Sequence, residues 1–91
     1  MMNLELVLGD LFEEVGEAHH AAFIKDDGAD PEWPIWYAEY LLGKINEAMG
    51  STLTKSELVY LIISAENERT TLAPGSVWTE FYARFMAERY S

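Results

Sequence analysis

The sequence predicts an all-α domain, a four-helix, up-down-up-down bundle with dimerisation as one way to complete its core. Apolar residues recur at helical spacing in four segments, and short stretches rich in turn-forming residues separate these segments. Of the 91 residues, 49% are apolar, which suffices for a single core. Four helices joined by short loops are typical of a bundle. We expect one helical domain over residues 1–91, with helices at about 3–24, 31–49, 54–69 and 77–90.

The first predicted helix, residues 3–24, has a narrow apolar stripe and two glycines. The residues of the stripe repeat at spacings of four and three: Leu4, Leu8, Leu11, Val15, Ala18 and Ala22. Gly9 and Gly16 lie two turns apart on nearly the same side, with Phe12 and Phe23 on the flank beside them. A glycine inside a helix costs roughly 1 kcal/mol relative to alanine. The two glycines are therefore expected to let a ring pack closely against the helix backbone.

The second predicted helix, residues 31–49, follows a polar loop in which Gly28 is the expected turn residue. Asp30 is the expected N-cap and Pro31 the first helical residue, where the missing N–H of proline costs nothing. Gly50 suits the position after the last turn. The pattern W-P-x-W-Y-A-x-Y-L at residues 33–41 resembles a segment of small bacterial proteins of uncharacterised activity. This resemblance implies no function.

The third and fourth predicted helices have clear starts. Thr54 and Glu57 match the capping box, S/T-x-x-E before an apolar run. The third helix then places Tyr60 and Ile63 opposite its main apolar side, which consists of Leu58, Leu61, Ile62 and Ala65. The stretch A-P-G-S at 73–76 breaks the chain. The fourth helix gathers its rings on one side, which is expected to face the core: Trp78, Phe81, Tyr82 and Phe85.

The second predicted helix is apolar on two faces. An aliphatic stripe is its natural core face: Ala38, Leu41, Leu42, Ile45 and Met49. Rings, a glycine and a glutamate occupy the opposite side, with Tyr37 at the flank: Trp33, Trp36, Tyr40, Gly43 and Glu47. One neighbouring helix cannot cover both faces. Three interpretations stay open: the rings are core, or they form a homodimer interface with each other or with Gly9 and Gly16, or they receive a different partner or a small apolar ligand.

The charge is strongly negative and uneven. The chain carries a net −10, and residues 1–50 hold eleven carboxylates against two lysines, a net −9. Binding to nucleic acid needs a basic footprint, so nucleic acid is not an expected partner, and anionic membranes are disfavoured for the same reason. A basic protein partner fits this charge, as does a purely solubilising acidic surface. The absence of cysteine, signal peptide and membrane-spanning run predicts a cytoplasmic protein.

No catalytic or metal-binding pattern stands out. Glu13, Glu17 and His20 approach a carboxylate–histidine spacing, but a dinuclear bundle site needs the Glu-x-x-His motif twice. The acidic loop lacks the ligand order of a calcium site, and no nucleophile, phosphate loop or dinucleotide motif is present. We therefore predict no cofactor and no catalytic residue.

The leading hypothesis is a non-enzymatic protein that acts by protein–protein contact as a homodimer. Its expected interface residues are Trp33, Trp36, Tyr37, Tyr40, Gly43, Gly9 and Gly16. The first alternative is a domain that binds a small apolar ligand, or an enzyme, with a pocket at the same face. The second alternative is an acidic inhibitor or immunity-type protein that caps a basic partner.

Overall fold

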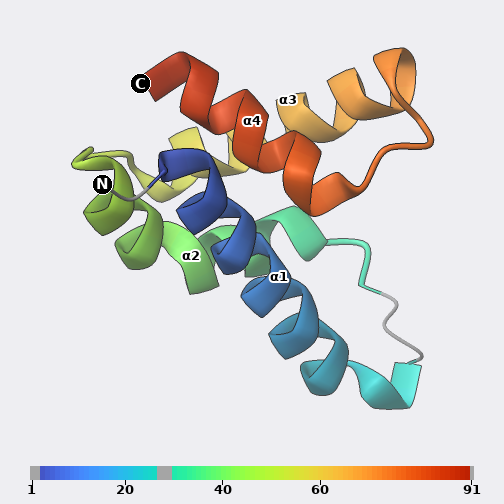
Figure 1. Ribbon diagram of the computed structural model, residues 1–91. Helices are drawn as coiled ribbons and strands as arrows, with labels where there is room; N and C mark the ends of the chain where they lie inside the picture. The colour runs from blue at the N-terminus through green and yellow to red at the C-terminus, as the bar shows by residue number, and fades with distance from the viewer. Residues whose placement is uncertain (1–2, 27–29, 91) are drawn as a thin grey trace.

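Four α-helices and one short 3-10 helix form the described part of the chain, residues 3–26 and 30–90, in a computed structural model (Figure 1). They are α1 (Leu4–Ala22), η1 (Ile24–Asp26), α2 (Trp33–Met49), α3 (Lys55–Leu72) and α4 (Trp78–Tyr90). The described residues contain no strand. The predicted all-α class is confirmed. None of these helices is long and apolar enough to cross a membrane.

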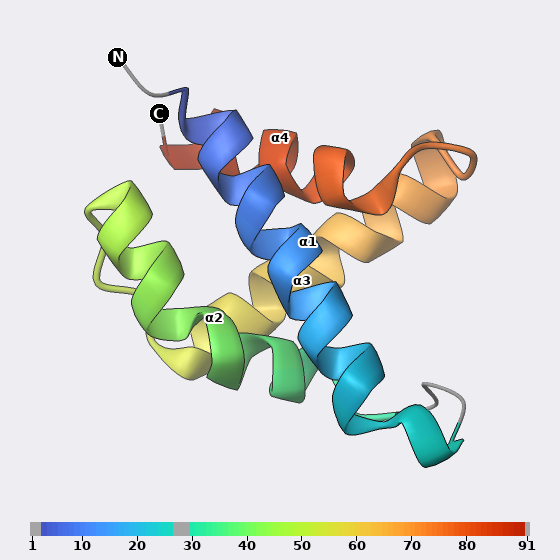
Figure 2. The ribbon, with the colours of Figure 1, turned by 60° about the horizontal axis from the view of Figure 1, so that its bottom comes forward.

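The helices pack in a ring that follows the order of the chain. α1 packs against α2 and α4, and α3 also packs against α2 and α4. Figure 2 shows α1 crossing in front of α3 at a steep angle, so the four helices do not share one common axis. The start of α1 and the end of α4 lie on the same side of the molecule (Figures 1 and 2). The radius of gyration is 12.7 Å, close to the value of about 12 Å expected for a folded chain of this length.

Side-chain caps and one glycine define several helix ends. The Asn3 side chain accepts a hydrogen bond from the backbone N–H of Glu5 at 2.8 Å, which caps α1. Thr54 and Glu57 form the predicted capping box at the start of α3. Gly50 ends α2 in the left-handed conformation, with φ at +63°, as its position in the sequence indicates.

The predicted start of α2 is wrong by two residues. The helix begins at Trp33 with Glu32 at the cap position, and Pro34 occupies the second helical position. Asp30 does not cap this helix, because one oxygen of its carboxylate accepts from the backbone N–H of Glu32 and the other lies 3.1 Å from Nε2 of His19. Both interactions hold Asp30 in the turn before the helix. The turn expected at Gly28 lies outside the described residues.

The core consists of one side of each helix. The predicted core side of α3 is confirmed, since its buried residues are Leu58, Leu61, Ile62 and Ala65. The buried side of α1 differs from the predicted stripe. Phe12, expected on a flank, is fully buried, whereas Leu4 and Leu11 are only half-buried. The Phe12 ring makes T-shaped contacts with Trp78 and Tyr82 of α4, at centroid distances of 6.3 and 5.4 Å, so this side of α1 faces that helix.

Gly9 and Gly16 allow α4 to approach the backbone of α1. A Cβ at Gly16 would stand 3.0 Å from the indole ring of Trp78, closer than atoms can pack without a shift. A Cβ at Gly9 would meet the Cβ of Ala83 at an ordinary 3.9 Å. Close packing of a ring at one glycine therefore occurs as expected, and the ring comes from the chain's own α4.

Candidate functional site

The aromatic face of α2 is covered in part by the end of α1. Trp36 and Tyr40 stack with centroids 5.7 Å apart. The Trp36 ring also meets His19 edge-on at 5.2 Å and Phe23 at 6.2 Å. His19 and Phe23 belong to the last turn of α1 and its C-cap. Trp36 and Tyr40 therefore belong to the packing between α1 and α2 of a single chain.

A second group of rings joins α2 to α4. Tyr37 packs edge-on against Trp33 at 5.1 Å and lies 5.9 Å from Trp78. Trp78 in turn packs against Tyr82 at 5.2 Å. Trp33, Trp36, Tyr37 and Tyr40 are all half-buried, so none is fully enclosed and none is fully open.

The predicted interface residues therefore separate into three places. The four rings of α2 lie against α1 and α4, as described above. Gly43 is exposed, with nothing near the position of a Cβ. Gly9 and Gly16 face α4 and have no contact with the rings of α2 at their Cβ positions.

A buried contact between the side chains of His19 and Asp30 holds the turn before α2 against α1. His19 Nε2 and Asp30 Oδ2 are 3.1 Å apart, and the two side chains are 8% and 11% exposed. The imidazole also lies among the rings of Phe23, Trp36 and Tyr37. His20, the histidine that the sequence analysis considered as a ligand, is exposed instead. Among residues 3–26 and 30–90, no three His, Asp or Glu side chains are arranged to hold a metal ion.

A second polar contact between α1 and α2 involves Glu14, Tyr40 and Lys44. The Tyr40 hydroxyl donates to Glu14 at 2.8 Å, and Lys44 Nζ lies 3.3 Å from the same carboxylate. The hydrogen bond from Tyr40, followed by Lys44, holds the pKa of Glu14 below its usual range. The same hydrogen bond raises the pKa of Tyr40. The Tyr40 hydroxyl is thus hydrogen-bonded to another residue of the same chain.

A third polar cluster joins α3 to α4 beneath Trp33. Arg69 donates two hydrogen bonds to Glu66, at 2.8 and 3.0 Å, and the Tyr82 hydroxyl donates a third at 2.9 Å. The Arg69 contact is the main reason why the pKa of Glu66 is lowered. Burial, followed by the hydrogen bond to Glu66, raises the pKa of Tyr82. A hollow of about 220 Å³ lies here, and three of its ionisable groups, Glu66, Arg69 and Tyr82, pair with one another.

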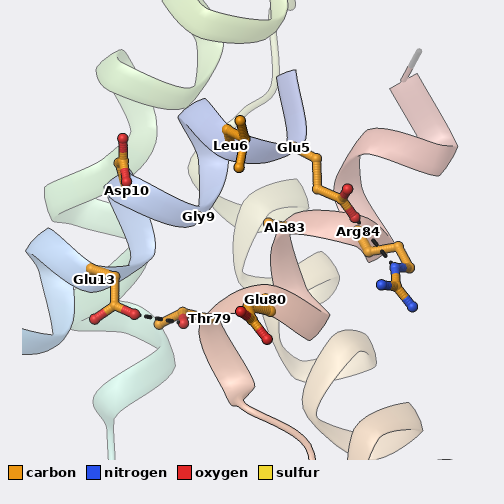
Figure 3. Close-up of a pocket in the computed structure, with 9 residues that line it drawn as sticks. All are labelled: Glu5, Leu6, Gly9, Asp10, Glu13, Thr79, Glu80, Ala83 and Arg84. Carbon is orange, nitrogen blue, oxygen red and sulfur yellow. Dashed lines mark hydrogen bonds and ion pairs between the residues drawn. The ribbon is translucent and has the colours of Figure 1, made fainter. Parts of the chain in front are cut away.

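The other candidate site is a groove between α1 and α4, with a volume of about 370 Å³ (Figure 3). Gly9 and Ala83 form its small-residue middle, where the two helices lie close together. At one end Glu13 accepts a hydrogen bond from Thr79 at 2.8 Å. At the other end Arg84 lies 3.3 Å from Glu5. Leu6, Asp10 and Glu80 complete the lining. We call the whole set the α1–α4 groove: Glu5, Leu6, Gly9, Asp10, Glu13, Thr79, Glu80, Ala83 and Arg84.

The α1–α4 groove is acidic and has an exposed apolar wall. Four carboxylates line it, against one guanidinium, that of Arg84. Among the described residues, Asp10 and Glu80 have no hydrogen-bond or ion-pair partner, and both are exposed. Leu6 is 69% exposed. Such a surface can hold a cationic group that carries an apolar stem.

Two residues of this groove were noted in the sequence, Gly9 for close packing and Glu13 for its spacing to Glu17 and His20, but neither was assigned to a groove. The other carboxylates were not singled out because acidic residues are abundant in this chain. One feature of the sequence could have indicated the groove: both Gly9 and Ala83 are small residues within helices, and two small residues allow two helices to lie close together. This feature becomes informative only when the first and last helices are known to be neighbours.

Comparisons with known proteins add no relative. No family model matches the chain, and neither the curated proteins nor the solved structures contain a match.

The Glu66 cluster predicts a loss of stability in acid. Because the pKa of Glu66 is lowered in the folded chain, its contribution is complete above the ordinary carboxyl pKa and is lost as the pH falls through the folded value. We expect Glu66→Gln to lower the melting temperature at neutral pH and to flatten its decline in acid. Thermal unfolding from pH 7 down to about pH 3 measures both effects.

Glu14→Gln is the matched control, because the pKa of Glu14 is also lowered but its side chain is 46% exposed. Its effect should be the smaller of the two, since solvent screens the pair. An acid profile of Glu66→Gln that parallels the parent profile would contradict the assignment.

Proposed function

We propose that the chain is a non-enzymatic binding protein that holds a basic segment of a partner protein in the α1–α4 groove. The observation that carries the proposal is that Asp10 of α1 and Glu80 of α4 line one groove, and neither carboxylate has a partner within residues 3–26 and 30–90. The net charge of −10 supports it, because a negative surface attracts a basic partner over a distance and speeds encounter.

The shape of the groove suits a lysine or arginine side chain. Gly9 and Ala83 carry no bulky side chain, so the groove stays open above the contact between the two helices. Leu6 offers an exposed apolar surface to the methylene stem, while the carboxylates reach the charged head. A volume of about 370 Å³ accommodates one or two such side chains and lies near the lower end of the range for small-molecule pockets, about 300–1,000 Å³. This arrangement favours the acidic inhibitor or immunity-type alternative among the sequence hypotheses.

Charge reversal in the groove should weaken binding of a basic peptide. The probe is a synthetic helical peptide rich in lysine and arginine, titrated at low ionic strength into the labelled chain. Amide resonances of Gly9 and Ala83 should shift, and Asp10→Lys or Glu80→Lys should each raise Kd several-fold, since one contact of this kind contributes about 0.2–1 kcal/mol. Added salt should weaken the complex.

Glu47→Lys is the matched control, because it makes the same change of charge on the exposed part of α2. It should leave the affinity close to that of the parent chain. If all three variants weaken binding equally, the peptide responds to net charge and the groove is not its site. A peptide that does not bind at low ionic strength would also contradict the proposal.

A second candidate function is self-association as a homodimer through the aromatic face of α2. The observation that favours it is the partial exposure of Trp33, Trp36, Tyr37 and Tyr40 beside the open surface at Gly43. Large half-buried rings are frequent anchors of protein interfaces. In this candidate the four helices form an up-down-up-down bundle. A second copy covers the outer aromatic side of α2.

Trp36→Ala tests this second candidate. The parent melting temperature should rise with protein concentration, because association stabilises the folded chain by mass action. The substitution should lower the melting temperature and remove the concentration dependence, since Trp36 belongs to the interface. Differential scanning calorimetry over a wide concentration range provides the comparison. A parent melting temperature that is independent of concentration would rule out this candidate.

A further inference from the structure

The acidic surface of α1 continues beyond the α1–α4 groove. Glu13, at one end of the groove in Figure 3, also lines an open hollow further along α1. The other residues of this hollow belong to α1, to α2 and to the first residue of α4. Together with Glu13 they form what we call the Trp78 hollow: Gly16, Glu17, His19, His20, Tyr37 and Trp78. Two carboxylates line it, and no lysine or arginine of the described chain does.

The Trp78 hollow lies two helical turns away from the middle of the groove. Gly9 faces α4 in the groove, and Gly16, seven residues later, faces α4 in the hollow. Asp10 and Glu17 are separated by the same seven residues, so they lie on one side of α1 and about 10.5 Å apart along its axis. Both are exposed, and among residues 3–26 and 30–90 neither has a hydrogen-bond or ion-pair partner. Two basic side chains at that separation can therefore each meet an unpaired carboxylate.

The aromatic wall of the hollow distinguishes it from the groove. Trp78 and Tyr37 lie 5.9 Å apart, are both half-buried, and both line the hollow. An indole ring attracts a cation more strongly than the other aromatic side chains do. A guanidinium group is planar and stacks on such a ring, whereas the compact, strongly hydrated ammonium of lysine does not. The wall therefore favours arginine over lysine.

His19 supplies a hydrogen-bond acceptor at the same place. Its side chain is 8% exposed, and its Nε2 lies 3.1 Å from the Asp30 carboxylate. Because a carboxylate only accepts hydrogen bonds, Nε2 of the neutral ring carries the proton and Nδ1 keeps a lone pair. Nδ1 has no partner among residues 3–26 and 30–90, and no buried side-chain nitrogen there lacks one, so solvent reaches Nδ1 through the hollow that His19 lines. A guanidinium has enough N–H groups to donate to both Nδ1 and Glu17.

We propose that the Trp78 hollow binds an arginine side chain of the basic partner segment, two helical turns from the basic side chain held at Asp10. This inference rests on the proposed function and specifies its partner. Residues seven positions apart on an α-helix share one side and match the separation of Asp10 and Glu17. In an extended strand a similar separation is reached after three positions, where side chains point to opposite sides. The segment that the surface fits is therefore a helix with basic residues seven positions apart.

The test compares helical peptides of identical composition that carry two arginines, either seven or five positions apart. Five positions correspond to about 140° of rotation, so the second arginine then points away from the surface. Each peptide is titrated by NMR into the labelled chain, at low ionic strength and about pH 8, where an ordinary imidazole is neutral. The seven-position peptide should bind several-fold more tightly and should shift the indole N–H resonance of Trp78 as well as the amide of Gly9. Replacing both arginines by lysine should weaken binding several-fold, although the charge is unchanged.

Glu17→Gln and Glu47→Gln separate the hollow from net charge. Both remove one exposed carboxylate, but only Glu17 lines the hollow. Glu17→Gln should abolish the advantage of the seven-position peptide, and Glu47→Gln should preserve it. If both peptides bind equally and shift Gly9 but not Trp78, the inference fails while the groove proposal stands. Equal binding of the lysine peptide, or an equal effect of both substitutions, would also overturn the inference. If neither peptide binds, the groove proposal fails with it.

Discussion

The close contact between α1 and α4 is the interaction on which the rest of the structure depends. Trp78 lies against the backbone of α1 at Gly16, and Phe12 makes T-shaped contacts with both Trp78 and Tyr82. This contact joins the first helix to the last and closes the ring of four. It also brings the two walls of the acidic groove together and places Trp78 where it covers Tyr37 of α2. Without it, neither the groove nor the contact between Trp78 and Tyr37 would exist.

The distribution of charge follows from that packing. The side of α1 that faces the core is apolar, so its carboxylates lie on the outside. There they either pair with a neighbouring helix, as Glu13 does with Thr79 and Glu14 with Tyr40, or remain unpaired, as Asp10 does.

Sequence patterns predicted local structure better than tertiary contacts. The capping box at Thr54, the left-handed glycine at the end of α2 and the buried side of α3 depend on neighbours within a few residues, and all three are confirmed. Phe12 was placed on a flank because helical spacing alone does not reveal that α4 approaches through the glycines. Asp30 was assigned as a cap because its partner, His19, is eleven residues away and becomes its neighbour only in the fold. The groove is also a tertiary feature, since its carboxylates belong to helices at opposite ends of the chain.

The most direct test of the α1–α4 contact compares Gly9→Ala with Gly16→Ala by thermal unfolding. Helix propensity alone predicts the same gain for both, about 1 kcal/mol. At Gly9 the new Cβ meets Ala83 at an ordinary distance, so this variant should unfold at a higher temperature than the parent. At Gly16 the new Cβ displaces Trp78, so this variant should be clearly less stable than Gly9→Ala, with altered tryptophan fluorescence. Equal stabilisation by both substitutions, with unchanged fluorescence, would show that Trp78 does not hold α4 against α1 in this way.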